Sequence, residues 1–161
     1  MPCYCSGAFQ TSGPVPKGEG DHVPLDRCRI AVVDNDRVYL EVIRDLLEDE
    51  GFSVVTHDDL ETGCGFLRKQ PADLVIVDIL QQREPLGLSL LTSLLQDDEL
   101  RNLPVIVVSA DERILREHAA QFQADGFAVL GKPFDFQELL RVICQALNLS
   151  TPRLASPSSA D

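Results

Sequence analysis

Short apolar runs alternate with longer amphipathic stretches through most of the chain. Five runs rich in β-branched or aromatic residues have the length and composition of β-strands, and they are Arg29–Val33, Ser53–Thr56, Leu74–Val77, Val105–Val108 and Phe127–Leu130. The third and fourth runs are apolar at every position. This pattern is typical of strands that are buried on both faces of a parallel sheet.

Apolar residues recur at helical spacing in each interval between these runs and again after the last one. The amphipathic stretches cover residues 38–47, 60–67, 90–95, 114–122 and 136–147, which predicts five helices. Ser109 and Asp135 each precede a glutamate by three positions, and this capping-box spacing predicts that both residues cap helices. Gly51 and Gly126 stand where the first and fourth helices are expected to end.

Five successive strand–helix units imply an α/β fold with a parallel sheet and helices on both faces, joined by right-handed crossovers. In open sheets of this kind, ligands bind outside the carboxyl ends of the strands. The residues that directly follow the strands are therefore the first candidates for a functional site.

Acidic, hydroxyl and basic residues follow four of the five predicted strands. In chain order they are Asp34 with its neighbours Asn35 and Asp36, then Asp78, Ser109 and Lys132. Carboxylates that are brought together repel one another, so this arrangement favours a hard divalent cation such as Mg²⁺ with oxygen ligands. A cation, a lysine and a hydroxyl around one carboxylate can cradle a phosphoryl group during transfer, and that carboxylate can be the nucleophile.

Each of these residues also has an ordinary structural explanation. Asp36 and Asp78 could cap a helix and a turn, Ser109 fits a helix cap, and Lys132 could be a solvated loop lysine. The placement of all of them at strand ends favours one shared site over four separate explanations. The sequence has no glycine-rich phosphate loop of the GxGxxG or GxxxxGK type, so nucleotide binding has no support.

Composition and charge narrow the function further. The chain has 161 residues, of which 44% are hydrophobic and 25% charged, as expected for one globular domain. A net charge of −12 argues against direct nucleic-acid binding, because basic residues make phosphate contacts. The sequence has neither an apolar run long enough for a membrane span nor a signal peptide, so we expect a cytoplasmic protein without membrane contact.

The domain boundaries follow from local composition. Residues 1–27 and 150–161 are rich in glycine, proline or serine and are expected to form flexible tails around one compact unit at 28–149. The five cysteines are odd in number and mostly scattered, which favours reduced thiols over a disulfide framework. Cys64 and Cys144 occupy apolar helix positions and are expected in the core.

Four short motifs at these strand ends resemble those of the receiver domain of response regulators, the phosphoacceptor domain of two-component signalling. They are Val32–Asp34, Leu74–Asp78, Val107–Ala110 and Lys132–Phe134. The resemblance covers about residues 28–149. It implies a flavodoxin-like (βα)5 fold with strand order 2-1-3-4-5, and a histidine kinase or phosphotransfer protein as donor. It also implies a downstream protein target, and a signalling domain that phosphorylates itself rather than an enzyme with turnover.

The resemblance assigns a role to each acidic position. Asp78 is the implied phosphoacceptor. Asp34, Asp78 and the backbone carbonyl of Leu80 are the implied Mg²⁺ ligands, with Asn35 or Asp36 as a further ligand. The family usually has two adjacent acids after the first strand, and Asn35 replaces the second of them with a neutral oxygen.

Other implied roles concern the phosphate and the switch. Lys132 is expected to pair with a phosphate oxygen, and Ser109 is expected to bind the phosphoryl group and signal its presence. Family members usually have a cis peptide bond at the position of Lys132–Pro133. The aromatic switch residue normally lies three positions before the lysine, where Val129 stands, so that Phe127 is a switch candidate only if the strand carries an insertion.

The segment after Asp78 departs from the family pattern in three ways. Gln82 replaces the usual proline, the usual glycine comes one place late at Gly87, and Leu80 is apolar. Receivers tune hydrolysis of the acyl phosphate partly through the residue two positions beyond the acceptor. Because Leu80 cannot orient a water molecule, we expect a long-lived phosphorylated state.

The sequence leaves two alternatives open. A pseudo-receiver, which keeps the fold as a docking module without phosphotransfer, is compatible with Asn35 and the altered loop. The segment Asp34–Asp36 also resembles the Asp-x-Asp pair of haloacid-dehalogenase-type phosphatases, although no late acidic pair completes that pattern. In receivers, the face of the fourth helix, fifth strand and fifth helix commonly passes the signal on, so it is the expected place for a homodimer.

Overall fold

The computed structural model describes residues 28–80 and 86–149, so both expected tails lie outside the described residues. Its five strands form one parallel sheet in the order β2-β1-β3-β4-β5, as predicted. The strands are β1 (Arg29–Val33), β2 (Ser53–His57), β3 (Leu74–Asp78), β4 (Val105–Ser109) and β5 (Ala128–Gly131). β3 and β4 are buried at every position, which explains their continuously apolar sequences.

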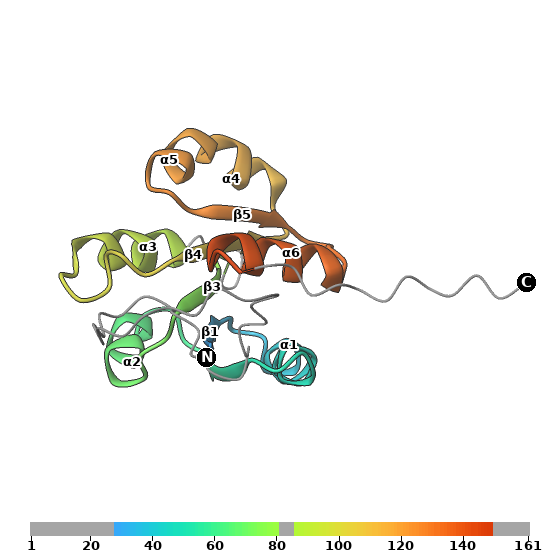
Figure 1. Ribbon diagram of the computed structural model, residues 1–161. Helices are drawn as coiled ribbons and strands as arrows, with labels where there is room; N and C mark the ends of the chain where they lie inside the picture. The colour runs from blue at the N-terminus through green and yellow to red at the C-terminus, as the bar shows by residue number, and fades with distance from the viewer. Residues whose placement is uncertain (1–27, 81–85, 150–161) are drawn as a thin grey trace, which may run out of the picture.

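Helices cover both faces of this sheet (Figure 1). Within the described residues they are α1 (Arg37–Asp49), α2 (Gly63–Lys69), α3 (Leu86–Gln96), α4 (Glu112–Glu117), α5 (Ala119–Ala124) and α6 (Phe136–Ala146). α1 and α6 lie on one face of the sheet, and α2 and α3 lie on the other (Figure 1). The core accordingly has two parts. One includes Leu40, Ile43 and Leu139, and the other includes Leu67, Leu90 and Phe122.

The fourth helical stretch was expected to be continuous, and this prediction is wrong. The structure divides it into α4 and α5 at His118, whose ψ of 4° departs from the helical value. The hydrogen bonds His118 N to Ile114 O and Phe122 N to His118 O remain, at 3.1 and 2.9 Å. The break is therefore a local change of the backbone dihedral angles at His118, across which hydrogen bonds between residues four apart continue, and apolar periodicity does not detect it.

Three of the four predicted boundary signals hold and one does not. Asp135 caps α6 by accepting a hydrogen bond from Glu138 N at 2.7 Å, and Gly51 and Gly126 have the positive φ expected after a helix end. Ser109 does not cap α4, because β4 continues through it and the helix begins three residues later. Asp111 is the cap instead and accepts hydrogen bonds from the backbone of the first helical turn.

Two further observations bear on the expectations from the sequence. Cys144 on α6 is fully buried as expected, whereas Cys64 on α2 is only partly buried. Across the part of the chain that the structure describes, no helix has both the length and the apolar character needed to cross a membrane.

Candidate functional site

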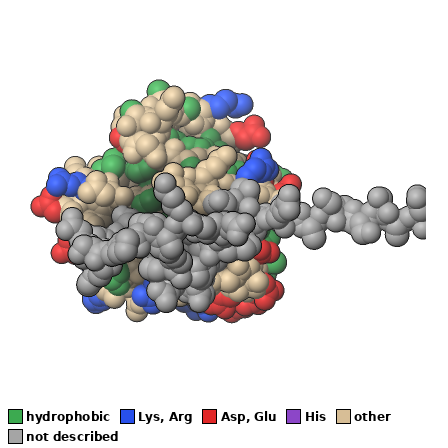
Figure 2. Space-filling model, viewed as in Figure 1, with side chains coloured by type: hydrophobic (Ala, Val, Ile, Leu, Met, Phe, Trp, Pro, Cys, Tyr) green, Lys and Arg blue, Asp and Glu red, His purple; other side chains and the backbone are tan. Residues whose placement is uncertain are grey.

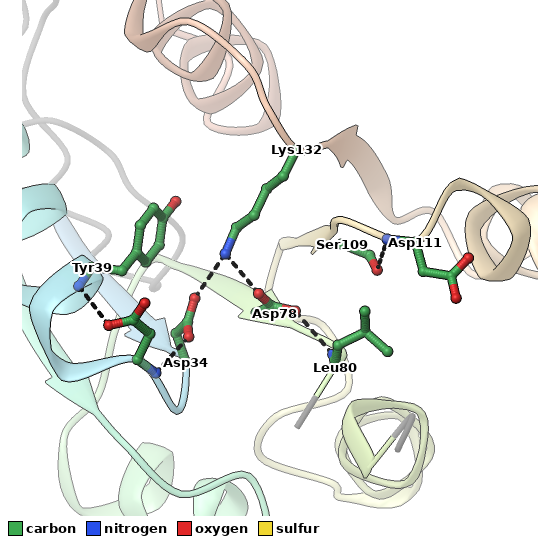
Figure 3. Close-up of polar contacts among 8 residues, drawn as sticks. Asp34, Tyr39, Asp78, Leu80, Ser109, Asp111 and Lys132 are labelled. Atoms are coloured by element: carbon green, nitrogen blue, oxygen red, sulfur yellow. Dashed lines mark hydrogen bonds and ion pairs between the residues drawn. The ribbon is translucent and has the colours of Figure 1, made fainter. Parts of the chain in front are cut away.

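Lys132 connects two carboxylates at the carboxyl ends of separate strands. Its Nζ lies 2.6 Å from Asp78 Oδ2 and 3.1 Å from Asp34 Oδ2 (Figure 3). Ser109 ends the neighbouring strand β4 and also borders this group. Within residues 28–80 and 86–149, the polar or charged side chains that are buried are Asp34, Asp78 and Ser109. The buried polarity of the described chain is therefore concentrated at the predicted site.

Strand register brings these residues together. Val33 pairs with Val77, which places Asp34 and Asp78 side by side just beyond the pair. Ser109 pairs with Gly131, and Lys132 N donates a hydrogen bond of 2.8 Å to Ser109 O. The Lys132–Pro133 peptide bond is cis, as expected from the resemblance.

Each carboxylate is held in the same way. Asp34 Oδ1 accepts a hydrogen bond of 2.8 Å from Asp36 N, and Asp78 Oδ1 accepts one of 2.9 Å from Leu80 N. In both residues the second oxygen faces Lys132. The backbone two residues downstream therefore fixes each carboxylate, and the remaining oxygens converge on one point.

Burial and charge shift the pKa values at this point in a consistent manner. Burial raises the pKa of Asp34, against the opposing effects of the Asp36 backbone hydrogen bond and the Lys132 charge, and the charge of Asp78 raises it further. Burial alone would lower the pKa of Lys132, but hydrogen bonds and charges from Asp78 and Asp34 outweigh it, so the pKa is raised. One lysine thus faces two carboxylates, and the site favours an additional positive charge.

The donor set fits a hard cation such as Mg²⁺. Asp34 and Asp78 are the carboxylates that converge here and would be its charged ligands. Within the described residues, no group of three or more His, Cys, Asp or Glu side chains is placed to hold a metal ion. Backbone oxygen such as that of Leu80 and water would complete a Mg²⁺ shell. Asn35 is exposed, and Asp36 accepts a hydrogen bond from Tyr39 N as the cap of α1, so Asp36 already has the structural role that the sequence left open.

The Ser109 hydroxyl is fully buried. Its Oγ accepts a hydrogen bond of 3.0 Å from Asp111 N, which ties the end of β4 to the start of α4. A hydroxyl that accepts one hydrogen bond can still donate another. The Ser109 hydroxyl therefore keeps the capacity to donate, and it is directly linked to the helix that follows.

The structure does not bring Phe127 to this site. Phe127 precedes β5 and contacts Phe122, with ring centroids 6.4 Å apart, at the opposite end of the strand from Lys132. The pairs from Ile106–Ala128 to Ser109–Gly131 are consecutive, so β5 has no insertion that would shift Phe127 toward Ser109. Val129 takes the place of the family's aromatic residue, and its side chain is 40% exposed.

Gly87 occupies a tight contact behind the Asp78 segment. A Cβ at this position would lie 2.3 Å from Ile79 Cα, and Gly87 N donates a hydrogen bond of 3.2 Å to Ile79 O. The glycine is therefore required by close backbone approach, although it comes one residue later than in the family pattern. Residues 81–85, which include Gln82, lie outside the described chain.

Tyr39 is the site neighbour that the sequence did not identify. Its ring centroid lies 4.0 Å from Lys132 Nζ (Figure 3), and burial is the main reason that its pKa is raised, so the phenol stays neutral. The position of Tyr39 could have indicated this role, because it lies three residues after the cap of α1, in the helical turn nearest the strand ends. Nothing in the apolar pattern distinguishes this tyrosine from an ordinary core residue.

Comparison with known proteins identifies the class. The sequence profile of the response regulator receiver domain matches residues 30–144, and the chain belongs to this family. The chain is 33% identical over 137 residues to the DNA-binding transcriptional regulator NtrC of Azospirillum brasilense, and the aligned region covers 84% of this chain. It is 30% identical over 120 residues to the polar-differentiation response regulator DivK of Brucella anthropi, which covers 71% of this chain and 91% of DivK.

Solved structures agree on the fold. A response regulator receiver protein from Burkholderia phymatum has a TM-score of 0.63 and 28% identity, and covers 78% of this chain and 98% of that one. The chemotaxis protein CheY4 of Vibrio cholerae has a TM-score of 0.65 with 19% identity, and covers 74% of this chain and 98% of CheY4.

The relatives differ in how much of their length this chain spans. It spans 27% of the A. brasilense NtrC and 55% of the response regulator MprA of Mycolicibacterium vanbaalenii.

Receiver domains are signalling domains of two-component systems, so the haloacid-dehalogenase interpretation has no support from these relatives. The second acid of that pattern, Asp36, caps α1 instead.

Proposed function

We propose that Asp78 accepts a phosphoryl group from a phosphohistidine donor in a Mg²⁺-dependent reaction and that this modification changes protein–protein contacts. The observation that carries the proposal is the convergence of Lys132 Nζ on Asp78 and Asp34 at 2.6 and 3.1 Å, beside the buried Ser109. The donor would be a histidine kinase or a phosphotransfer protein. Such a donor implies a cytoplasmic setting.

The transfer forms a bond between phosphorus and a carboxylate oxygen of Asp78 and breaks the phosphorus–nitrogen bond of the donor. The donor imidazole retains the electron pair of that bond. Lys132 is already within hydrogen-bond distance of Asp78 and would pair with a phosphoryl oxygen. When bound by Asp34, Asp78 and the Leu80 carbonyl, Mg²⁺ would offset the negative charge of the phosphoryl oxygens.

Ser109 would report the modification. A phosphoryl oxygen at Asp78 offers the Ser109 hydroxyl a charged acceptor, which is a stronger partner than a neutral group. Because Asp111 N donates to Ser109 Oγ, movement of the hydroxyl would be felt at the cap of α4. With Val129 in the aromatic place, the signal would pass through this link rather than through an aromatic side chain.

The donor and the target would use different surfaces. On α1 the apolar side chains Val38, Val42 and Leu46 are 70%, 51% and 38% exposed and follow one another at intervals of four residues. This stripe begins at Val38 in the first turn of α1, the end of the helix that is nearest the site, and it suits a donor helix. Acidic side chains gather around α1 at the lower right of Figure 2, which favours a partner with basic residues beside its apolar contact and disfavours nucleic acid.

The face formed by α4, β5 and α6 is the proposed output surface. Val129 is a large apolar residue exposed on β5 within this face. A homodimer or a downstream protein would cover it. β5 is the edge strand opposite to β2, and α1 packs beside β2, so the centre of this face lies toward the other edge of the sheet from α1.

The test is labelling with acetyl phosphate, which supplies a phosphoryl group without a protein donor. Intact-mass measurement should detect one phosphoryl group in the parent protein with Mg²⁺ and none with a chelator. Asp78→Asn should remove the label, while Asp98→Asn, which changes an exposed carboxylate, should keep it. A label that survives in Asp78→Asn would contradict the proposal.

A docking module without phosphotransfer is the second candidate. The exposed Asn35 and the use of Asp36 as a helix cap favour it, because both reduce the charge available for a cation. In that case the parent protein would remain unlabelled while its fold is intact.

A further inference from the structure

The Tyr39 side chain provides Lys132 with a neutral contact on the side away from Asp78. Figure 3 shows Lys132 Nζ between the Tyr39 ring and Asp78. The distance from Nζ to the ring centroid is 4.0 Å, which is within the range of cation–π attraction. The same nitrogen donates to Asp78 and Asp34. The ammonium is therefore held by charge from the carboxylates and by the face of an aromatic ring.

The position of Tyr39 is fixed independently of the lysine. It is the third residue of α1, and its backbone N donates a hydrogen bond of 3.1 Å to Asp36 Oδ1, the cap of that helix. Its side chain is partly buried and packs against the core between the sheet and the α1 and α6 helices. The ring is thus a firm support and does not depend on Lys132 for its place.

The ring, rather than the hydroxyl, makes the contact. The Tyr39 hydroxyl oxygen is buried and has no hydrogen-bond partner among the described residues. Its loss should therefore leave the contact with Lys132 unchanged. This distinguishes phenylalanine, which keeps the ring, from leucine, which fills the space without a π face.

We propose that Tyr39 is a positioning residue, which keeps Lys132 Nζ beside Asp78 when a bound cation offsets the charge of Asp34 and Asp78. The inference rests on the proposed function. A cation at the carboxylates weakens their attraction for the ammonium, whereas attraction to a neutral ring does not depend on carboxylate charge. Lys132 then remains within reach of a phosphoryl oxygen on Asp78.

The test measures two affinities by calorimetry, that of Mg²⁺ alone and that of beryllofluoride at saturating Mg²⁺. Beryllofluoride mimics a phosphoryl group on an aspartate and needs the lysine, whereas Mg²⁺ does not. Tyr39→Leu should weaken beryllofluoride binding by roughly three- to tenfold, from the usual strength of a cation–π contact. Its Mg²⁺ affinity should be equal to that of the parent or tighter, and Tyr39→Phe should match the parent in both.

Fluorinated phenylalanines at position 39 give a second test that keeps the core filled. Ring fluorines withdraw electron density with little change in shape, so beryllofluoride affinity should fall stepwise with the number of fluorines. This series decides the question if Tyr39→Leu does not fold.

Two results would overturn the inference alone. One is a Tyr39→Leu protein, or a fluorinated series, with unchanged beryllofluoride affinity. The other is equal weakening of beryllofluoride and Mg²⁺ binding, which indicates a merely structural role. A parent protein that binds Mg²⁺ but not beryllofluoride would overturn the proposed function and this inference together.

Discussion

At the scale of single residues, Asp34 and Asp78 are held in an unfavourable arrangement. Each fixes one oxygen on a backbone N–H two residues downstream, and both direct the other oxygen at the same lysine. Asp34 is only 2% exposed, and its pKa is raised chiefly because burial disfavours its charged form. Sites of this kind commonly reduce stability in return for function.

Asp34→Asn should therefore stabilise the protein in the absence of divalent cations. Asparagine keeps a side-chain oxygen that can accept the hydrogen bond from Asp36 N, and it removes a buried charge. Lys132 keeps its ion pair with Asp78. We expect the free energy of unfolding at neutral pH to rise by about 1 kcal/mol. Urea denaturation of the parent and the variant measures this change.

The pH dependence of this gain follows from the direction of the pKa shift. A carboxyl group with a raised pKa in the folded state destabilises the fold when it is ionised, and this cost disappears as the pH falls through the folded pKa and below the unfolded value. The advantage of Asp34→Asn should thus be largest at neutral pH and shrink in acid. A variant less stable than the parent at neutral pH contradicts this account, and Asp98→Asn serves as the control.

Leu80→Asn tests the tuning of phosphoryl lifetime. Leu80 follows Asp78 by two positions and has no polar atom in its side chain to orient a water molecule. Asparagine could hold an attacking water, so phospho-Asp78 should decay several-fold faster, on the scale of one added hydrogen bond. The half-life is measured after removal of the phosphodonor. Leu80→Met should decay like the parent, and an unchanged half-life in Leu80→Asn rejects the hypothesis.

At the scale of secondary-structure elements, α3 packs directly on the segment that follows β3. Gly87→Ala should cost about 1–3 kcal/mol, because its Cβ would overlap the backbone of Ile79 and the start of α3 must move. Gly65→Ala in α2 is a matched control, since a Cβ there meets no atom within 4 Å. It should stabilise the protein by up to about 1 kcal/mol through helix propensity. Equal effects of both substitutions, measured by urea denaturation, would contradict the packing argument.

The elements also show what local sequence could predict. Apolar runs such as Leu74–Val77 specify strands because both faces of β3 are buried, and residues after such strands must lie at one edge of the sheet. The meeting of Asp34, Asp78 and Lys132 at one edge of the sheet could therefore be predicted from their positions directly after the apolar runs. The tight contact at Gly87 depends on helix placement, so the sequence showed only a glycine displaced by one position.

Other features depend on tertiary geometry. Two examples are the division of α4 from α5 at His118 and the capping of α4 by Asp111. Both depend on small differences in backbone conformation at a helix end, which the local sequence does not determine. The contact between Tyr39 and Lys132 joins residues that are 93 positions apart in the sequence. No periodic pattern in the sequence predicts such a contact. Phe127 was a switch candidate only because an insertion in β5 was conceivable, and the regular register of β5 has none.

At the scale of the whole molecule, the proposed donor surface on α1 and the proposed output surface around β5 lie toward opposite edges of the sheet. Saturation with Mg²⁺ and beryllofluoride should promote association through the α4, β5 and α6 face, as measured by sedimentation velocity. Val129→Asp should weaken this association because it places a charge in the apolar contact. Val38→Asp, on the exposed stripe of α1, is the control and should leave association unchanged. Equal loss in both variants would contradict the assignment of the face.

The most direct test of the central claim is the location of the phosphoryl group. The parent protein is incubated with acetyl phosphate and Mg²⁺, the acyl phosphate is reduced with borohydride, and the modified residue is identified by peptide mass spectrometry. The account predicts modification at Asp78, lost in the presence of chelator and in Asp78→Asn. Modification at Asp34 or Asp36 instead, or a folded protein that carries no label with Mg²⁺, would contradict it.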